Sequence, residues 1–305
     1  MNLRFVEAFH WAVSLNSVTR AAQKLHITQS ALSARIAALE DELGTVLVDR
    51  RDKQFRLTVA GQRFHALAVR LLDMQRLIKE EMGRNASGPV VLRIGAIESV
   101  VHSWLPGWIQ QMRQTHPDFA LELTVETSPV LIDQVRRGAQ DLVFAAIAAS
   151  DASLRTRHMR PMPMVFVGHT ERHVEPCYSL QELASCELLT FQRGSQPHQA
   201  LLELFQREQL PSPRIHAISS ISAMVQLVEG GLGVATLPEA AVQQLSRHSP
   251  LRVLRTTVQL APLPIYASYR EDPTSNLTDS VFSSALAYLK ENALEAEQPD
   301  TPEAA

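Results

Sequence analysis

The first 44 residues repeat apolar side chains at the spacing of short amphipathic helices, which are separated by polar turns. Phe5 and Phe9 begin the first apolar stripe, and a second helix is expected from about Ser17 to Leu25. Ala21 and Ala22 lie on its inward face, where small side chains permit another helix to approach closely. The pattern therefore predicts a small helical core at the N-terminus.

A third helix is expected between Thr28, a good N-cap, and Gly44, a common C-terminal residue. Its buried stripe is Leu32, Ile36, Leu39 and Leu43. The polar residues left on or beside the outer face are Gln29, Ser30, Ser33 and Arg35. Gln bonds adenine, Arg bonds guanine, and Ser serves bases or phosphates, as in a helix-turn-helix reading a major groove. The alternative is a three-helix interaction domain with a polar surface.

Residues 45–57 alternate enough to predict a two-stranded wing after the third helix. Basic residues dominate its expected turn, which carries Arg50, Arg51 and Lys53 beside Asp52. Thr58 should then open a long helix with apolar residues in a heptad rhythm. Those residues are Ala60, Phe64, Leu67, Leu71, Met74 and Ile78. So long a helix on so small a domain predicts self-association, with packing on its own domain as the alternative.

Residues 83–89, GRNASGP, form a turn-rich segment that predicts a domain boundary. Beyond it, expected strands alternate with helices, as in a parallel or mixed sheet. The strands are expected at 90–96, 121–126, 141–147, 164–168, 188–192, 215–219, 234–237 and 264–269. Proline pairs at 161 and 163, and at 262 and 264, predict two chain crossings between two lobes with a cleft.

The expected organisation is therefore multidomain, with an α-helical N-terminal part and an α/β C-terminal part. The domains are a winged helix-turn-helix (1–58), a linker helix and hinge (59–88) and a two-lobed domain (89–294). Lobe I is expected at about 89–161 and 267–294, and lobe II at about 162–266. The acidic, Pro-containing residues 295–305 are expected to form a disordered tail.

Composition adds a charge asymmetry to this picture. Residues 1–88 hold 13 Lys and Arg against 9 Asp and Glu, whereas residues 89–305 hold 16 against 23. The basic first part favours a polyanionic partner. No apolar stretch approaches the length of a membrane-spanning helix, and the 2 cysteines are too few for a disulfide scaffold, so a cytoplasmic protein is expected without a membrane partner.

At residues 21–61 the sequence reads AAQKLHITQSALSARIAALEDELGTVLVDRRDKQFRLTVAG, which resembles the N-terminal signature of LysR-type transcriptional regulators. Further along, the Ile94-Gly95-Ala96 strand, Leu105-Pro106, His116-Pro117 and the GGLGVATLP stretch at 230–238 match family features in the same order. The resemblance implies a winged helix-turn-helix, a dimerising helix and a domain like a periplasmic binding protein, assembled as a homodimer or homotetramer.

As a member of that family, the protein is expected to bind double-stranded promoter DNA and a small-molecule effector, and to act with RNA polymerase. Gln29, Ser30 and Ser33 would then lie at the groove, with Arg50, Arg51 and Lys53 near the DNA backbone or minor groove on the wing side. For Arg50 the alternative is a local carboxylate pair that holds the wing. Ser30 departs from the family's usual proline, so base preference is not carried over from relatives.

The resemblance also places effector contacts in the turns after the strands of both lobes. Those positions are Ser99, His102, Thr127, Ser128, Arg193, Ser195 and Thr236. Free N–H groups at helix starts favour anions, which points to an anionic effector. For each hydroxyl, helix capping is the alternative, most clearly for Ser128 before Pro129. Glu98 would disfavour a carboxylate effector unless it points away or pairs with Arg193.

No catalytic arrangement stands out, so the protein is expected not to be an enzyme and to need no cofactor. His169 and His173 have a spacing that could hold a metal on a helix, but no third ligand is apparent. Cys177 and Cys186 both precede the strand that redox-sensing cysteines follow in the family. A solute-binding protein with oligomerising N-terminal helices, and an enzyme on the two-lobed scaffold, are the rival interpretations.

Overall fold

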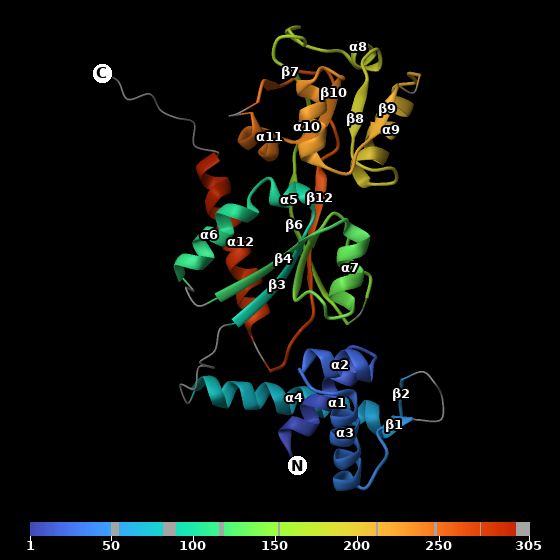
Figure 1. Ribbon diagram of the computed structural model, residues 1–305, viewed down its shortest axis with the longest axis vertical. Helices are drawn as coiled ribbons and strands as arrows, with labels where there is room; N and C mark the ends of the chain where they lie inside the picture. The colour runs from blue at the N-terminus through green and yellow to red at the C-terminus, as the bar shows by residue number, and fades with distance from the viewer. Residues whose placement is uncertain are drawn as a thin grey trace, which may run out of the picture.

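The computed structural model describes residues 1–49, 55–81, 90–115, 119–151, 153–211, 213–246, 249–274 and 276–296. Figure 1 shows three parts along the long axis of the molecule: a helical N-terminal domain, lobe I and lobe II. The N-terminal domain contains α1 (Leu3–Ser14), α2 (Val18–Lys24), α3 (Gln29–Leu43), β1 (Val48–Asp49), β2 (Arg56–Leu57) and α4 (Val59–Glu81). This order confirms the expected winged helix-turn-helix followed by a long helix.

The core of the N-terminal domain follows the apolar stripes of α1, α2 and α3. Phe9, Ala21, Leu32 and Leu39 are fully buried together, whereas Leu43 is 37% exposed. The prediction that Leu43 belongs to the core stripe is therefore wrong, because α3 ends there as Gly44 takes a left-handed φ of 64°.

Two polar contacts define the ends of α3. The Thr28 hydroxyl accepts the Ala31 N–H at 3.2 Å, as expected of an N-cap. Near the other end, the buried Glu40 carboxylate accepts the N–H groups of Leu47 and Val48 at 2.8 and 3.0 Å. These two bonds tie the start of the wing to α3, so the wing and α3 have a fixed relative position.

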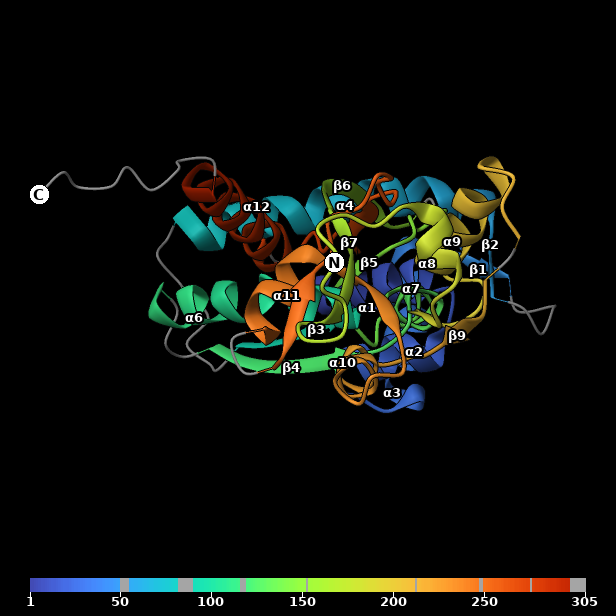
Figure 2. The same ribbon diagram turned by 90° about the horizontal axis from the view of Figure 1, so that it is seen from above.

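Lobe I is a five-stranded mixed sheet in the order β4-β3-β5-β12-β6. Its helices cover both faces, with α6 and α12 on one side and α7 on the other (Figure 1, Figure 2). The elements are β3 (Val90–Ala96), α5 (Glu98–Val101), α6 (Leu105–Thr115), β4 (Phe119–Val125), α7 (Ser128–Arg136), β5 (Leu142–Ala145), β6 (Arg155–Met162), β12 (Leu263–Tyr269) and α12 (Leu277–Ala296).

Lobe II has a second five-stranded sheet, in the order β11-β7-β10-β8-β9. Its elements are β7 (Met164–His169), α8 (Leu180–Ala184), β8 (Leu188–Thr190), α9 (Gln196–Arg207), β9 (Ile215–Ala217), α10 (Ile221–Glu229), β10 (Val234–Pro238), α11 (Glu239–Leu245) and β11 (Leu251–Val253). Leu188 packs in a cluster with α8 and α9, and the next residue, Leu189, packs with α10 and α11. Consecutive strand residues thus serve opposite faces, and both faces are buried.

The chain crosses between the lobes twice, near the two proline pairs, as predicted. The two crossing strands lie side by side in lobe I, where Leu263 pairs with Met162 and Tyr269 with Arg155. Residues 263–266, which the sequence interpretation assigned to lobe II, therefore belong to the lobe I sheet. At the C-terminus, α12 continues to Ala296, two residues into the expected tail, and residues 297–305 lie outside the described part of the chain.

All eight expected strands are present, and two more were missed. One is β6, whose outward residues are charged and which contains Pro161, as an edge strand of a sheet can. The other is β11, a three-residue strand at the edge of lobe II. Both lie at sheet edges, where one side of the backbone is unpaired and the apolar pattern is weak.

Candidate DNA-reading helix and interlobe cavity

The first turns of α3 present a polar face that packs against nothing in the described chain. Gln29, Ser30 and Ser33 are exposed, and Arg35 is half-buried. Ser30 lies 3.0 Å from the Thr28 hydroxyl, so its own hydroxyl is partly held by the helix cap. Gln29, Ser30 and Ser33 are therefore exposed together at the N-terminal end of a helix, the geometry of a groove-reading helix. Arg35 lies on another side of α3, where burial raises the pKa of Glu7 of α1 and Arg35 is near enough to that carboxyl to oppose the rise. Arg50, Arg51 and Lys53 lie outside the described residues.

The long helix α4 divides its predicted stripe between two surroundings. Phe64 and Leu71 pack against the N-terminal domain, whose core also takes in Ala68 and Leu72. On another side of the same helix, Leu67, Met74 and Ile78 have exposed fractions of 56–58%. Within a single chain, part of the apolar stripe of α4 is therefore buried and the other part is an exposed apolar surface. The helix extends away from its own domain (Figure 1).

A cavity of about 500 Å³ lies between lobes I and II, a volume typical of small-molecule sites. Lobe I lines it with the turns after β3, β4 and β5, and lobe II with the turn after β8. Five of the seven predicted effector residues line this cavity: Ser99, Thr127, Ser128, Arg193 and Ser195. These five positions meet in one cavity because residues at the carboxyl ends of neighbouring strands lie at one sheet edge; that they bind an effector stays a prediction.

The hydroxyls in the cavity have different roles. Ser128 is not the N-cap of α7, which is Thr127, and its oxygen accepts the Ala146 N–H at 3.0 Å. Ser195 precedes α9, but its oxygen caps no N–H group. Ser195 Oγ and the neighbouring Gln196 Oε1 are buried and have no hydrogen-bond partner among the described residues. Buried polar atoms are rarely left unpaired, so this pair marks a place for a ligand or water.

Glu98 connects the two lobes at the edge of the cavity. Its carboxylate accepts the Ile221 N–H at 2.8 Å and the Ser220 hydroxyl at 3.1 Å, both at the start of α10 in lobe II. Burial raises the pKa of Glu98, but hydrogen bonds from His102, Ile221 and Ser220 outweigh it and hold the pKa below its ordinary value. The Glu98 carboxylate therefore binds the N-terminus of α10 and does not pair with Arg193. A helix N-terminus favours anions, and here the anion is a side chain of the protein itself.

Two predicted effector residues are not among those that line the cavity. His102 lies 3.4 Å from the Glu98 carboxylate and supports it from the end of α5. Thr236 is buried in the middle of the lobe II sheet, where its hydroxyl lies 2.7 Å from that of Thr190. The structure thus places Thr236 in a buried hydrogen bond between strands β10 and β8.

Sequence reasoning missed the apolar lining of the cavity. Val125, Ile147, Phe191 and Leu263 provide it, with Ile97 at the end of the β3 turn. All five of these residues stand at or within two positions of a strand end, as the predicted hydroxyls do, so strand ends were the available signal. The sequence alone did not identify them, because an isolated apolar residue in a turn is common in any fold.

The remaining candidates from the sequence have ordinary local explanations. His173 Nδ1 accepts the His169 N–H at 3.0 Å, and His169 Nδ1 accepts the Glu171 N–H at 3.1 Å, so each ring shapes its own turn. Within the described ranges, no group of three or more His, Cys, Asp or Glu residues is placed to hold a metal ion. A membrane-crossing helix was also sought in that part of the chain, and none is long and apolar enough.

A helix-turn-helix with an exposed polar helix, joined through a long helix to two lobes around a ligand-sized cavity, defines a ligand-responsive DNA-binding regulator. The family description "LysR substrate binding domain" matches residues 88–290, and "Bacterial regulatory helix-turn-helix protein, lysR family" matches residues 3–62. The chain belongs to the LysR family of transcriptional regulators, which are DNA-binding proteins with an effector domain and not enzymes.

Relatives and solved structures agree over nearly the whole chain. The HTH-type transcriptional regulator BenM of Acinetobacter baylyi is 27% identical over 291 residues, covering 93% of this chain and 95% of BenM. A full-length OxyR variant from Pseudomonas aeruginosa has a TM-score of 0.63 at 22% identity, with 95% of each chain covered. Full-length CbnR complexed with its target DNA has a TM-score of 0.56 at 19% identity, covering 94% of this chain and 99% of CbnR. The last two show likeness of fold.

Proposed function

We propose that the protein binds a promoter as a homodimer or homotetramer in the cytoplasm, and that an effector in the interlobe cavity changes how it acts on RNA polymerase there. The observation that carries this proposal is the polar face of Gln29, Ser30 and Ser33, left uncovered at the start of α3. A buried stripe holds the opposite side of that helix in the core, so the polar face is presented rigidly.

We assign the reading of base edges to Gln29 and Ser33, and a flanking contact with bases or phosphate to Arg35 and Ser30. The wing arginines Arg50 and Arg51, with Lys53, are proposed to contact the DNA backbone beside the groove. Backbone contacts of this kind make affinity fall as salt rises, whereas base contacts set the sequence preference.

The effector we propose is a small molecule with an apolar body and one anionic or hydrogen-bond-accepting end. Phe191, Ile147 and Leu263 supply the apolar walls, while Arg193 and Ser195 supply donors on the lobe II side. Glu98 already occupies the start of α10, so the anionic end of the effector belongs near Arg193 and Ser195. Ser99, Thr127 and Ser128 would contact the effector from lobe I.

Assembly is proposed to run through α4. Leu67, Met74 and Ile78 form an exposed apolar strip that a second copy of the helix would cover in a coiled-coil-like pair. Because each helix is anchored in its own N-terminal domain by Phe64 and Leu71, pairing of the helices would set the spacing of two α3 helices on DNA.

The test is a genome-wide map of the DNA fragments that the purified full-length protein binds, read at moderate salt. Discrete sites with dyad symmetry upstream of genes are the expected result. Molecules related to the products of those genes would then be tested for binding to the wild type and to Arg193→Gln and Ser195→Ala variants. Diffuse, salt-sensitive binding without preferred sites would contradict a sequence-specific role for α3.

A further inference from the structure

The N-terminal domain rests on lobe I of the same chain through an apolar contact and an ion pair. Leu15, at the end of α1, is 2% exposed and lies against Gly138 of lobe I, where a Cβ would come within 3.0 Å of the leucine. Beside it, Lys24 of α2 lies 3.2 Å from Asp141, which also binds Arg93 at 2.7 Å. The two domains therefore meet along a defined surface.

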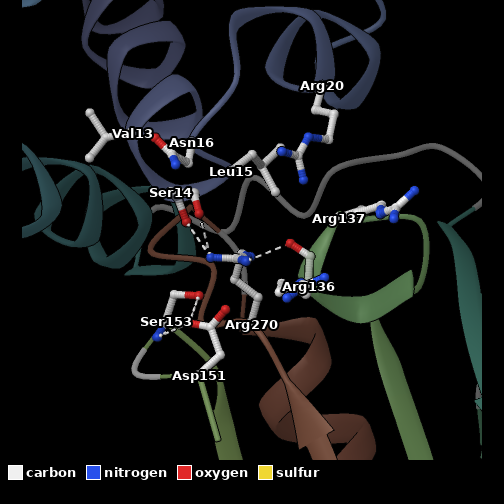
Figure 3. Close-up of a pocket in the computed structure, with 10 residues that line it drawn as sticks. All are labelled: Val13, Ser14, Leu15, Asn16, Arg20, Arg136, Arg137, Asp151, Ser153 and Arg270. Atoms are coloured by element: carbon white, nitrogen blue, oxygen red, sulfur yellow. Dashed lines mark hydrogen bonds between the residues drawn. The ribbon is translucent and has the colours of Figure 1, made fainter. Parts of the chain in front are cut away.

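A second cavity, of about 710 Å³, opens beside this contact and is walled by both domains (Figure 3). Four arginines line it: Arg20 from α2, Arg136 and Arg137 from the end of α7, and Arg270 from the end of β12. Uncharged polar groups of the N-terminal domain, at Ser14 and Asn16, complete its upper wall in Figure 3. The cavity lies at the interdomain contact, separate from the interlobe cavity and its lining residues.

Arg270 is the buried centre of this cavity and is 8% exposed. Its guanidinium donates to the Ser14 carbonyl at 2.6 Å, the Ser14 hydroxyl at 3.0 Å and the Arg136 carbonyl at 3.0 Å. Its Nε is buried without a hydrogen-bond partner, and within the described part of the chain Arg270 forms no ion pair. Burial lowers the pKa of this guanidinium, which shows how poorly the site solvates its charge. A buried cation normally has an anionic partner.

The carboxylates near the cavity do not balance its positive charge. Asp151 accepts the N–H and hydroxyl of Ser153 at 2.8 and 2.6 Å, and its charge partly offsets that of Arg270, since it raises the pKa of the guanidinium. Asp133 pairs with both Arg136 and Arg137 on the outer side of α7. Four arginines thus line the cavity with one carboxylate, Asp151, and even with Asp133 counted the positive charges exceed the negative ones by two.

We propose that this interdomain cavity binds a small polyanion, a molecule that carries two or more phosphate or carboxylate charges. Guanidinium groups recognise both kinds of oxyanion through paired N–H donors, which is the chemistry that Arg20, Arg137 and the free Nε of Arg270 offer. The volume accommodates a molecule of nucleotide size.

The ligand bridges the N-terminal domain and lobe I. Arg20 belongs to the DNA-reading domain, whereas Arg137 and Arg270 belong to the effector domain, so an anion held by all three favours the docked arrangement of the two domains. A polyanion that binds the docked arrangement better than the undocked one shifts the population toward it. This site is independent of the interlobe cavity and of any effector bound there.

The experiment is isothermal titration calorimetry of the full-length protein with inorganic pyrophosphate and, separately, with citrate. The wild type is expected to bind one of these probes saturably, at one site per chain. A double variant, Arg20→Gln with Arg137→Gln, should bind at least about tenfold more weakly, since each lost charge-assisted hydrogen bond is worth roughly a factor of ten or more. Both side chains lie at the surface of the cavity, so the variant should fold, which a thermal melt checks.

Two further variants control the interpretation. Arg113→Gln removes an exposed arginine from α6, far from the cavity lining, and should bind the probe like the wild type. Ser195→Ala alters the interlobe cavity alone and should also leave binding unchanged. The proposal is overturned by no saturable binding to the wild type, by equal binding to the double variant, or by loss of binding in Ser195→Ala. A double variant that loses duplex DNA affinity yet keeps its pyrophosphate affinity also overturns it, because the arginines would then serve the DNA backbone.

Discussion

Glu98 of lobe I accepts a hydrogen bond from the backbone N–H of Ile221 in lobe II, across the mouth of the cavity, at 2.8 Å. The Ser220 hydroxyl adds a second bond to the same carboxylate at 3.1 Å. A further bond between the lobes joins α11 to lobe I, where Gln244 Nε2 donates to the Ser103 carbonyl at 2.7 Å. The lobes are therefore held together by contacts of the chain itself.

Replacing Glu98 by Gln should weaken this contact between the lobes. The side chain is 22% exposed. Glu98→Gln turns hydrogen bonds to a charged group, worth about 1.5 to 3 kcal/mol, into neutral ones worth about 0.5 to 1.5 kcal/mol, so the free energy of unfolding should fall by about 1 to 2 kcal/mol. Urea unfolding of the full-length protein measures the change, with Glu203→Gln on the exposed side of α9 as the matched control. Equal stability of Glu98→Gln and the wild type would contradict the role of this contact.

The effect of Glu98 should also depend on pH in a fixed direction. The folded protein holds the Glu98 pKa below the ordinary value of 4.5, so its contribution to stability is present above that pH. As pH falls through the lower folded-state pKa, the carboxylate takes up a proton and the contribution is lost. The stability difference between the wild type and Glu98→Gln should therefore be constant near neutral pH and shrink below about pH 4.5. A difference that grows on acidification would contradict this assignment.

The exposed strip on α4 leads to a prediction about assembly. Met74→Glu places a charge on a side chain that is 56% exposed in the single chain, so folding should be retained while pairing of two α4 helices is disrupted. Light scattering should report a lower molecular mass than for the wild type. Leu71 is a poorer target because it packs against its own domain, and a charge there would damage the fold as well. Gln62→Glu, at an exposed position near the start of α4, is the control, and an unchanged mass of Met74→Glu would contradict the proposed interface.

Much of the fold could be predicted from the sequence because its elements depend on local patterns. The period of apolar residues locates α1 to α4 and the eight central strands, and the caps at Thr28 and Gly44 locate the ends of α3. The pattern was insufficient at the sheet edges, where β6 presents charged residues to solvent, and at the lobe boundary, which depends on the pairing of Leu263 with Met162. Pairing of distant strands is not encoded in a local period.

In the candidate site, too, the local positions could be predicted from the sequence and the contacts between distant parts could not. Strand ends identified Ser99, Thr127 and Ser195, because a sheet brings its carboxyl ends together. The partner of Glu98 depends instead on how lobe II approaches lobe I, and the burial of Thr236 depends on β10 being a central strand. Neither fact is contained in the residues adjacent to these side chains.

Gln29 should contribute to sequence preference without contributing to the salt dependence of binding. Gln29→Ala removes an uncharged side chain, so affinity for the preferred duplex should fall by about 1 to 3 kcal/mol, roughly five- to one-hundred-and-fifty-fold. The slope of log affinity against log salt concentration should stay the same, because no phosphate contact by a cation is lost. Fluorescence anisotropy at several salt concentrations measures both quantities. Gln111→Ala, exposed on α6, serves as control, and unchanged affinity of Gln29→Ala would contradict the assigned role.

Thr236 should matter for stability and not for effector binding. Thr236→Val keeps the shape of the side chain but leaves the buried Thr190 hydroxyl without its partner at 2.7 Å. The free energy of unfolding should fall by about 1 to 3 kcal/mol, the cost of an unsatisfied buried group. The affinity for an effector, measured by calorimetry, should remain that of the wild type. Thr127→Val, in the cavity, is the comparison, and a loss of effector affinity in Thr236→Val with unchanged stability would reverse the assignment.

The ion pair between Lys24 and Asp141 should control how firmly the DNA-reading domain is docked on lobe I. Burial raises the pKa of Asp141, but Arg93 and Lys24 outweigh it and keep the carboxyl ionised. Lys24→Met removes the interdomain partner of a charge that Arg93 still neutralises, together with the contact of the ammonium with the Trp11 ring inside the N-terminal domain. The docked state should lose roughly 1 kcal/mol, enough to raise the undocked population severalfold. Small-angle scattering should then show a larger radius of gyration at unchanged mass. Lys290→Met on α12 is the control, and an unaltered scattering profile of Lys24→Met would contradict this role of the ion pair.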